Sequence, residues 1–233
     1  MGNQRISLIP AEPEPFAVDF TRTAVLVIDM QNAFVSRGGY FDLAGLDISP
    51  AREIITSCRL ITRLSREKMI KIIYLQMGFG DDLSELGGPN SPVFQKSRAL
   101  KIMQDRPELK EKLQIFGSWG AEIIEELKPQ PGDIVIRKRK HNGFIGTNLD
   151  FILNTHDIRY LLFTGIATNI CVQATLSHAF SLGYFPLLVS DAVSPMGPAL
   201  TQEATIINVK SSFGWVTTSE NVAETLKRWQ PVT

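Results

Sequence analysis

Short apolar runs alternate along the chain with longer stretches of helical periodicity. The apolar runs are rich in β-branched residues and end at polar or turn residues, which is typical of buried strands. The longer stretches place apolar residues three and four positions apart, as on one buried helix face. We predict strands at 24–29, 70–76, 133–138, 160–164, 185–190 and 214–217. We predict helices at 51–67, 121–127, 149–154, 169–182, 199–209 and 221–229.

This alternation predicts the α/β class, with one doubly wound, mostly parallel sheet that carries helices on both faces. We find no linker or internal repeat, so residues 21–233 are expected to form a single domain. Ligands of such sheets bind beyond the carboxyl ends of the strands. Polar residues at strand ends are therefore the first candidates for a functional site.

Two segments depart from the alternation. Residues 1–20 contain three prolines and no long apolar run, which predicts an extended N-terminal arm and argues against a signal peptide or membrane anchor. Residues 77–118 are too long for a plain connection, and only 107–113 has a strong helical pattern. We expect 77–118 to be an insertion that covers the substrate.

Composition narrows the class of partner. The 233 residues are 44% hydrophobic, enough for a sizeable core, and 24 basic residues balance 24 acidic ones. No net charge draws the chain to nucleic acid or a membrane, so a small-molecule partner is expected. The two cysteines imply no disulfide framework and favour a reducing compartment, the cytoplasm. Cys58 lies in a helical apolar pattern and is expected in the core.

Three strand-end residues carry the candidate chemistry: Asp29, Lys138 and Cys171. A thiol at the first turn of a helix feels the positive end of the macrodipole, which favours the thiolate. At one edge of a sheet, the three side chains would supply a general base, a stabilising cation and a nucleophile. Each also has a structural interpretation: Asp29 as a turn cap, Lys138 as part of a solvated basic run, and Cys171 as a small buried hydrophobe.

The three histidines are scattered. His178 lies seven residues after Cys171, about 10 Å along a regular helix, which excludes a direct hydrogen bond between them. His156 is expected in a loop. His141 follows Lys138 and could approach the pocket as a substrate contact, or could be an exposed loop imidazole. No spacing of histidine and carboxylate residues indicates a metal site, and no cofactor is expected.

The segments around these residues resemble the isochorismatase-like cysteine hydrolase superfamily, through 27–34, the strand end at Lys138, and 165–171. The match spans nearly the whole chain. Further segments resemble the ureidoacrylate amidohydrolases within that superfamily: 38–45, 87–92, 117–119, 129–135 and 213–216. The cysteine argues against the isochorismatases proper, and the lack of a metal cluster argues against the nicotinamidase branch.

The resemblance implies a role for each residue. Cys171 would be the nucleophile, Asp29 the base that takes its proton, and Lys138 the cation beside that carboxylate. A cis peptide between Ile166 and Ala167 would turn the N–H of Ala167 toward the site, where it would form an oxyanion hole with the N–H of Cys171. The reaction implied is hydrolysis of a ureido or carbamoyl amide through a thioester, with release of ammonia and carbon dioxide. Relatives are commonly homo-oligomers.

Candidate substrate contacts follow from the same resemblance, and some depart from it. The subgroup tends to carry Asn, Trp and Tyr at the positions of Met77, Phe79 and His141, so specificity could have shifted to a less polar amide. Met77 and Phe79 could instead be core residues. The alternative functions are another small-amide hydrolase of the superfamily, of the N-carbamoyl amino acid, biuret or nicotinamide type, and a non-catalytic ligand-binding member of the fold. A protonated His141 would serve a carboxylate best. We predict these substrate contacts: Phe34, Met77, Phe79, Glu85, Trp119, His141 and Phe144.

Overall fold

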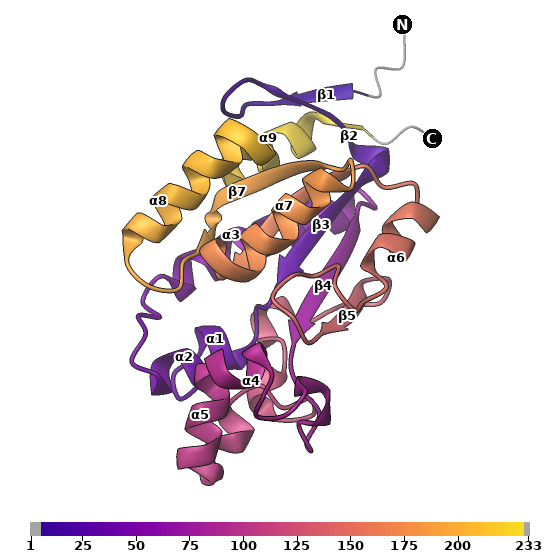
Figure 1. Cartoon of the computed structure of the whole chain (residues 1–233). Helices are drawn as coiled ribbons and strands as arrows, with labels where there is room; N and C mark the ends of the chain where they lie inside the picture. The colour runs from indigo at the N-terminus through magenta and orange to yellow at the C-terminus, as the bar shows by residue number, and fades with distance from the viewer. Residues whose placement is uncertain (1–5, 231–233) are drawn as a thin grey trace, which may run out of the picture.

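Six parallel strands form the centre of the structure, a computed structural model that describes residues 6–230. They are hydrogen-bonded in the order β5-β4-β3-β6-β7-β8 (Figure 1). The predicted parallel sheet is therefore confirmed. The strands are β3 (Thr23–Ile28), β4 (Lys71–Met77), β5 (Ile134–Lys138), β6 (Tyr160–Ile166), β7 (Phe185–Ser194) and β8 (Trp215–Thr217).

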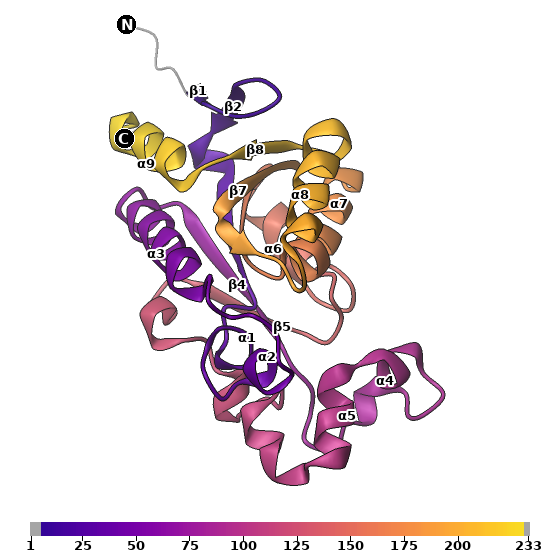
Figure 2. The same ribbon diagram turned by 90° about the vertical axis from the view of Figure 1, so that its left-hand side faces the viewer.

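Helices cover both faces of this sheet, as Figure 2 shows edge-on. Helices α3 (Ala51–Glu67) and α9 (Ser219–Arg228) pack against one face. Helices α6 (Leu149–Thr155), α7 (Gln173–Ser181) and α8 (Ala199–Asn208) pack against the other. The predicted doubly wound arrangement is confirmed.

The apolar strands explain why both faces must be covered. Val25 and Val27 of β3 belong to the cluster under α3, whereas Ala24, Leu26 and Ile28 belong to the cluster under α6 and α7. All five side chains are fully buried. Because successive strand residues point to opposite faces, a continuous apolar run requires a helix layer on each side.

The N-terminal segment packs against the rest of the protein. Strands β1 (Ile6–Ile9) and β2 (Phe16–Asp19) form an antiparallel pair, and Glu12 forms a bridge with Val216 of β8. Residues 1–5 of the predicted arm lie outside the described residues. The side chains of Ile9 and Phe16 are buried in the core, whereas those of Ile6 and Leu8 are exposed.

The predicted helix at 121–127 is wrong. This stretch contains two short 3-10 turns, Trp119–Ala121 and Glu125–Leu127. Between them the backbone pairs with the segment after β3: Asn32 N donates to Glu122 O, and Ile124 N donates to Met30 O. These hydrogen bonds use backbone N–H and C=O groups that a continuous helix would need for its own hydrogen bonds. Pairing with a distant segment therefore overrides the local helical pattern.

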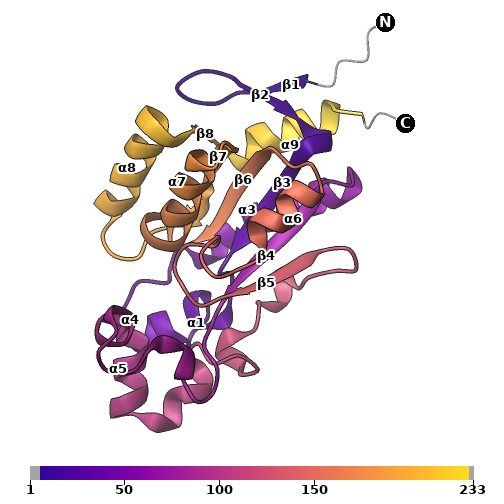
Figure 3. The ribbon, with the colours of Figure 1, turned by 45° about the vertical axis from the view of Figure 1, so that its right-hand side comes forward.

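The 77–118 stretch folds beyond the carboxyl ends of the strands, together with α1 (Asn32–Val35) and α2 (Tyr40–Leu43) (Figure 3). Its α-helices are α4 (Pro92–Lys96) and α5 (Arg98–Asp105), capped by the side chains of Ser91 and Ser97. The predicted helical segment 107–113 is instead a 3-10 helix, Pro107–Lys112. The remaining 3-10 turns described are Phe20–Arg22 and Ser84–Leu86.

Candidate active site

The order of the sheet reverses direction between β3 and β6. From β3 the chain moves outward to β4 and β5, and from β6 it moves outward to β7 and β8 on the other side. Asp29 directly follows β3, and Cys171 lies in the turn after β6. Both side chains therefore lie at a topological switch point, where α/β sheets bind ligands.

Gly165 makes the close approach of β3 and β6 possible at this point. Its φ is +106°, and a Cβ atom there would lie 2.0 Å from the carbonyl oxygen of Ile28. A side chain at residue 165 would push the two strands apart just before the site. The following peptide, between Ile166 and Ala167, is cis, as the family resemblance implied.

Asp29 has an unusual backbone and a free oxygen. Its φ of +53° is left-handed, which few residues other than glycine adopt and which is often found at functional sites. Its N–H donates to the carbonyl of Leu75 at 2.8 Å. The side chain is 1% exposed, and Oδ1 has no hydrogen-bond partner within the described residues. A buried carboxylate oxygen without a partner is costly, which marks it as an atom held ready for a proton.

Lys138 holds the other oxygen of Asp29. Its side chain is fully buried, and Nζ lies 2.8 Å from Asp29 Oδ2 and 3.3 Å from the carbonyl oxygen of Lys140. The solvated-face interpretation is therefore wrong for Lys138, although it describes Arg137 and Lys140, which are exposed. Successive side chains of strand β5 point to opposite faces of the sheet, so Lys138 points inward where Arg137 points outward.

The charges of the pair follow from competing effects. Burial raises the pKa of Asp29, and the Lys138 ammonium opposes that rise. Burial lowers the pKa of Lys138, but the Asp29 carboxylate outweighs it, so the pKa of Lys138 is raised and the amine stays protonated. The site thus contains an ammonium next to a carboxylate that binds a proton more readily than a solvated one.

Cys171 lies in a π-helical turn, Thr168–Val172, that precedes α7. Single π turns within helices are frequent at functional sites. The thiol is 7% exposed, and burial raises its pKa to about 12 while Lys138 acts in the opposite direction. Burial thus opposes the thiolate, which the helix terminus and Lys138 favour. The resting group is a thiol, and it needs a base.

His141 lies beside that thiol. Its Nδ1 is 3.5 Å from Cys171 Sγ, whereas the residue as a whole is exposed at the mouth of the site. Burial of the ring and the nearby Lys138 ammonium lower the pKa of His141 below 6.5. The imidazole is neutral near pH 7 without substrate, and a protonated His141 that serves a substrate carboxylate stays a prediction.

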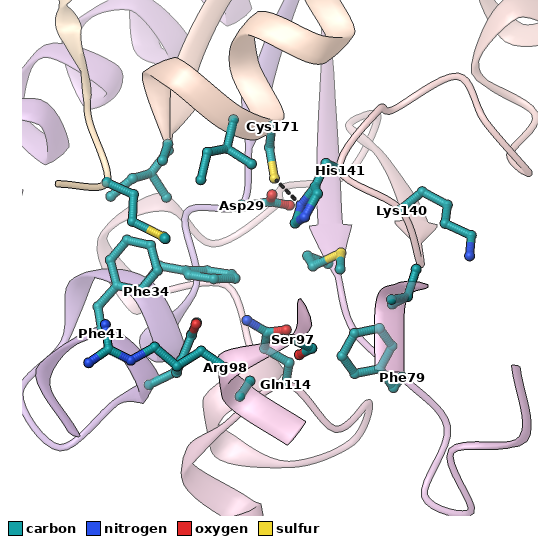
Figure 4. A pocket seen from close by; sticks show the side chains of 18 of the residues that line it. Asp29, Phe34, Phe41, Phe79, Ser97, Arg98, Gln114, Lys140, His141 and Cys171 are labelled. Carbon is teal, nitrogen blue, oxygen red and sulfur yellow. Dashed lines mark hydrogen bonds between the residues drawn. The ribbon is translucent and has the colours of Figure 1, made fainter. Parts of the chain in front are cut away.

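These side chains open into one cavity of about 210 Å³ (Figure 4). Asp29, His141 and Cys171 lie together on one wall, and the aromatic rings of Phe34, Phe41 and Phe79 lie around them. The side facing Cys171 carries polar groups from the 77–118 stretch: Ser97, Arg98 and Gln114. The cavity thus offers an apolar enclosure with a few convergent polar groups, the usual character of a small-molecule site.

Of the seven predicted substrate contacts, four line the cavity and three do not. Phe34, Met77, Phe79 and His141 line it, and so does Ala167 of the predicted oxyanion hole. The other three predicted contacts, Glu85, Trp119 and Phe144, do not.

Each of the three outliers has a structural contact instead. Glu85 accepts hydrogen bonds from Gly80 N and from Arg139 Nε, which positions the arginine at the cavity wall. The Trp119 ring lies 4.5 Å from Lys112 Nζ. The Phe144 ring packs 5.3 Å from the ring of His178, in the core under α6 and α7.

Three polar residues of the cavity were not predicted from the sequence. Ser97, Arg98 and Gln114 come from the segment whose fold was least predictable. Gln114 is 6% exposed, and its side-chain amide makes no hydrogen bond to the described residues. The available signal was its position as a lone polar residue between Leu113 and Ile115, both of which are buried.

Two other kinds of feature are absent from residues 6–230. No group of three His, Cys, Asp or Glu side chains there is arranged to hold a metal ion. Among the same residues, no helix is both long enough and apolar enough to span a membrane.

Comparison with known proteins gives the family. A family model described as the isochorismatase domain matches residues 23–221. Ureidoacrylate amidohydrolase RutB of Caulobacter segnis is 46% identical over 226 residues, which cover 97% of this chain and 95% of the relative. The protein of that name from Klebsiella pneumoniae is 44% identical, covering 96% and 95%. The chain belongs to the isochorismatase family.

Solved structures agree on the fold. A cysteine hydrolase from Pseudomonas syringae pv. phaseolicola superimposes with a TM-score of 0.73 at 22% identity, covering 95% of this chain and 97% of its own. N-carbamoylsarcosine amidase from Thermoplasma acidophilum gives a TM-score of 0.64 at 23% identity, covering 85% and 97%. The isochorismatase-like hydrolase fold predicted from the sequence is confirmed.

Proposed function

We propose that the chain is an amidohydrolase that cleaves the carbamoyl C–N bond of a ureidoacrylate-type substrate through a thioester at Cys171, as a step of pyrimidine degradation. Relatives at 44 to 46% identity over nearly the whole chain bear the name ureidoacrylate amidohydrolase. The observation that carries the chemistry is the free, buried Oδ1 of Asp29 in the same cavity as the Cys171 thiol.

In the first half-reaction, Asp29 Oδ1 takes the thiol proton and the sulfur attacks the carbamoyl carbon. The new C–S bond forms as the carbonyl π electrons move to oxygen. The intermediate then collapses, the C–N bond to the amine breaks, and the proton held by Asp29 passes to the leaving nitrogen. Lys138 stays an ammonium throughout and keeps Oδ2 fixed, so Oδ1 is the oxygen that exchanges protons.

In the second half-reaction, Asp29 takes a proton from water and the hydroxyl oxygen attacks the S-carbamoyl carbon. The C–S bond breaks, and the Asp29 proton returns to the sulfur. The released carbamic acid ionises to carbamate, which decomposes to ammonia and carbon dioxide. Net consumption is one water per substrate, and the enzyme returns to its resting thiol.

We assign the oxyanion hole to the backbone N–H groups of Ala167 and Cys171, because both residues line the cavity at the switch point. Preorganised donors at the developing oxyanion are worth about 3 to 4 kcal/mol in acyl transfer. The donors need no side chain, so substitution at either position would change them only indirectly.

We also propose that the 77–118 insertion covers the substrate. Met77, Phe79, Ser97, Arg98 and Gln114 all come from it and line the cavity. Of these, Ser97, Arg98 and Gln114 lie on the side that faces Cys171 (Figure 4). Arg98 and Gln114 supply donors for a carboxylate or ureido oxygen. The apolar Met77 and Phe79 favour a less polar or differently shaped amide than a fully polar site would.

The cellular setting is part of the proposal. Both cysteines are free and buried, which fits a reducing compartment, and we place the enzyme in the cytoplasm. Exposed apolar side chains on α7 and α8, including Phe180, Leu200 and Ile207, fit a homo-oligomer.

The test is an ammonia-release screen with the purified protein. The compounds are ureidoacrylate, N-carbamoyl amino acids, biuret and nicotinamide, and Cys171→Ala serves as the matched control. We expect ureidoacrylate to exceed nicotinamide by at least about tenfold in kcat/KM, a difference that one hydrogen bond can supply. Inert ureido compounds alongside rapid nicotinamide hydrolysis would refute the substrate class. A protein inert toward all of them would favour a ligand-binding member of the family.

A further inference from the structure

The mechanism above leaves one contact of the reacting sulfur unused. His141 Nδ1 lies 3.5 Å from Cys171 Sγ, the one side-chain hydrogen-bond contact that the thiol makes within residues 6–230. His141 follows β5 in the chain and reaches the sulfur from the cavity mouth (Figure 4). The imidazole therefore touches the nucleophile from the solvent side, while Asp29 and Lys138 are sealed behind it.

His141 Nδ1 lies within hydrogen-bond distance of the resting thiol, whereas Asp29 Oδ1, in the same cavity, makes no hydrogen bond within the described residues. Oδ1 is a fully buried carboxylate oxygen with no other partner among the described residues, whereas His141 lies at the mouth, where water can satisfy its ring. Leaving the buried charged acceptor unpaired costs far more. Asp29 Oδ1, and not His141, is therefore the acceptor that takes the thiol proton when the sulfur attacks.

This assignment of the proton to Asp29 favours one tautomer of His141. The ring is neutral and carries one proton, on either Nδ1 or Nε2. If Nδ1 were bare, its lone pair would face the thiolate that remains after this proton transfer, 3.5 Å away with no proton between them. With the proton on Nδ1, the same contact becomes an N–H···S hydrogen bond.

We propose that His141 is a further catalytic residue, whose Nδ1–H donates a hydrogen bond to the Cys171 sulfur and stabilises the thiolate formed when Asp29 takes the proton. The inference rests on the proposed function in one respect, that this sulfur is the nucleophile. No bond to His141 is made or broken. A donor strengthens its hydrogen bond when the acceptor becomes an anion, so the contact favours the thiolate over the resting thiol. The same donor stabilises the sulfur as it leaves in the second half-reaction.

Alkylation of Cys171 by iodoacetamide tests this without any substrate. Rates at pH 7.5 are followed by peptide mass spectrometry in the wild type, His141→Phe and His141→Asn. Phe keeps a ring but removes the donor, whereas the Asn side-chain amide places an N–H close to the position of Nδ1. His156→Phe is the matched control, because His156 is an exposed residue at the end of α6. Buried Cys58 reports any unfolding within the same sample.

We expect His141→Phe to slow alkylation about tenfold or more, the size of one hydrogen bond to an ionised group, and His141→Asn to recover most of the rate. His156→Phe should match the wild type. Equal rates in the wild type and His141→Phe would overturn the inference, and so would equally slow rates in both His141 variants. A failure of the proposed function is distinguishable, since it would appear as absent hydrolysis with this alkylation pattern intact.

Discussion

The ammonium of Lys138 lies 2.8 Å from Oδ2 of Asp29, although β4 lies between their strands and 109 positions separate them in the chain. Both side chains are sealed from solvent. The contact occupies one carboxylate oxygen and leaves the other, Oδ1, without a partner in the described part of the protein. An asymmetric carboxylate of this kind can exchange a proton at one atom while it remains anchored at the other.

Lys138→Ala should reduce kcat/KM by at least about a hundredfold, because it frees Asp29 to change position and removes the cation that keeps it ionised. Arg137→Ala is the matched control, since its exposed side chain precedes Lys138 on the same strand. Steady-state kinetics of the two variants make the comparison. Equal effects of the two substitutions would show that the basic run acts only as a charged surface.

Asp29→Asn should destabilise the fold as well as inactivate the enzyme. An amide cannot balance the buried ammonium, and a buried pair broken in this way costs about 3 to 5 kcal/mol. Urea denaturation measures the change, with Cys171→Ala as a control expected to lose about 1 kcal/mol. Coincident unfolding midpoints for Asp29→Asn and the wild type would mean that the ion pair contributes little.

Activity should fall as the pH is lowered, in an acid limb that belongs to Asp29. Burial raises the pKa of this carboxyl above 3.8, and the protonated form has no oxygen free to take the thiol proton. His141 has a lowered pKa and is already neutral above 6.5, so no step is expected at that pH. Measurement of kcat/KM from pH 4 to 8 in the wild type and in His141→Phe checks both points. Loss of the acid limb in His141→Phe would show that the titrating group is His141 and not Asp29.

Chelation should leave the activity unchanged. The Asp29, Lys138 and Cys171 side chains account for the base, the anchored charge and the nucleophile without a Lewis acid. Prolonged dialysis against EDTA, followed by assay and by elemental analysis of the protein, makes the measurement. Loss of activity that one equivalent of zinc restores would place the enzyme in a metal-dependent branch of the family.

The sequence predicted the parts of the site that depend on topology. Asp29 and Cys171 follow apolar runs that can only be central strands, so the switch point brings them together in any doubly wound sheet. Lys138 was harder to assign, because Arg137, Lys138, Arg139 and Lys140 look alike in the chain. Only the orientation of β5 shows which of the four points inward.

The predictions from sequence were wrong where contacts between distant segments determine the structure. The 121–127 pattern is helical by itself, but its backbone pairs with residues 30 to 32. Glu85, Trp119 and Phe144 are close in sequence to residues that line the cavity. Their side chains instead contact those of Arg139, Lys112 and His178, respectively. His141 was predicted as a substrate contact. Its position beside the sulfur depends on the conformation of the loop after β5, which no local sequence pattern predicts.

The covalent intermediate is the central claim, and it can be observed directly. The wild-type enzyme is mixed with ureidoacrylate, quenched in acid within the first turnover, and analysed by intact-protein and peptide mass spectrometry, with Cys171→Ala treated in parallel. The account predicts a transient mass increase of one carbamoyl group on the peptide that contains Cys171, absent from Cys58 and from the variant. Turnover by the wild type with no adduct at any quench time, or turnover by Cys171→Ala at even a tenth of the wild-type rate, would contradict it.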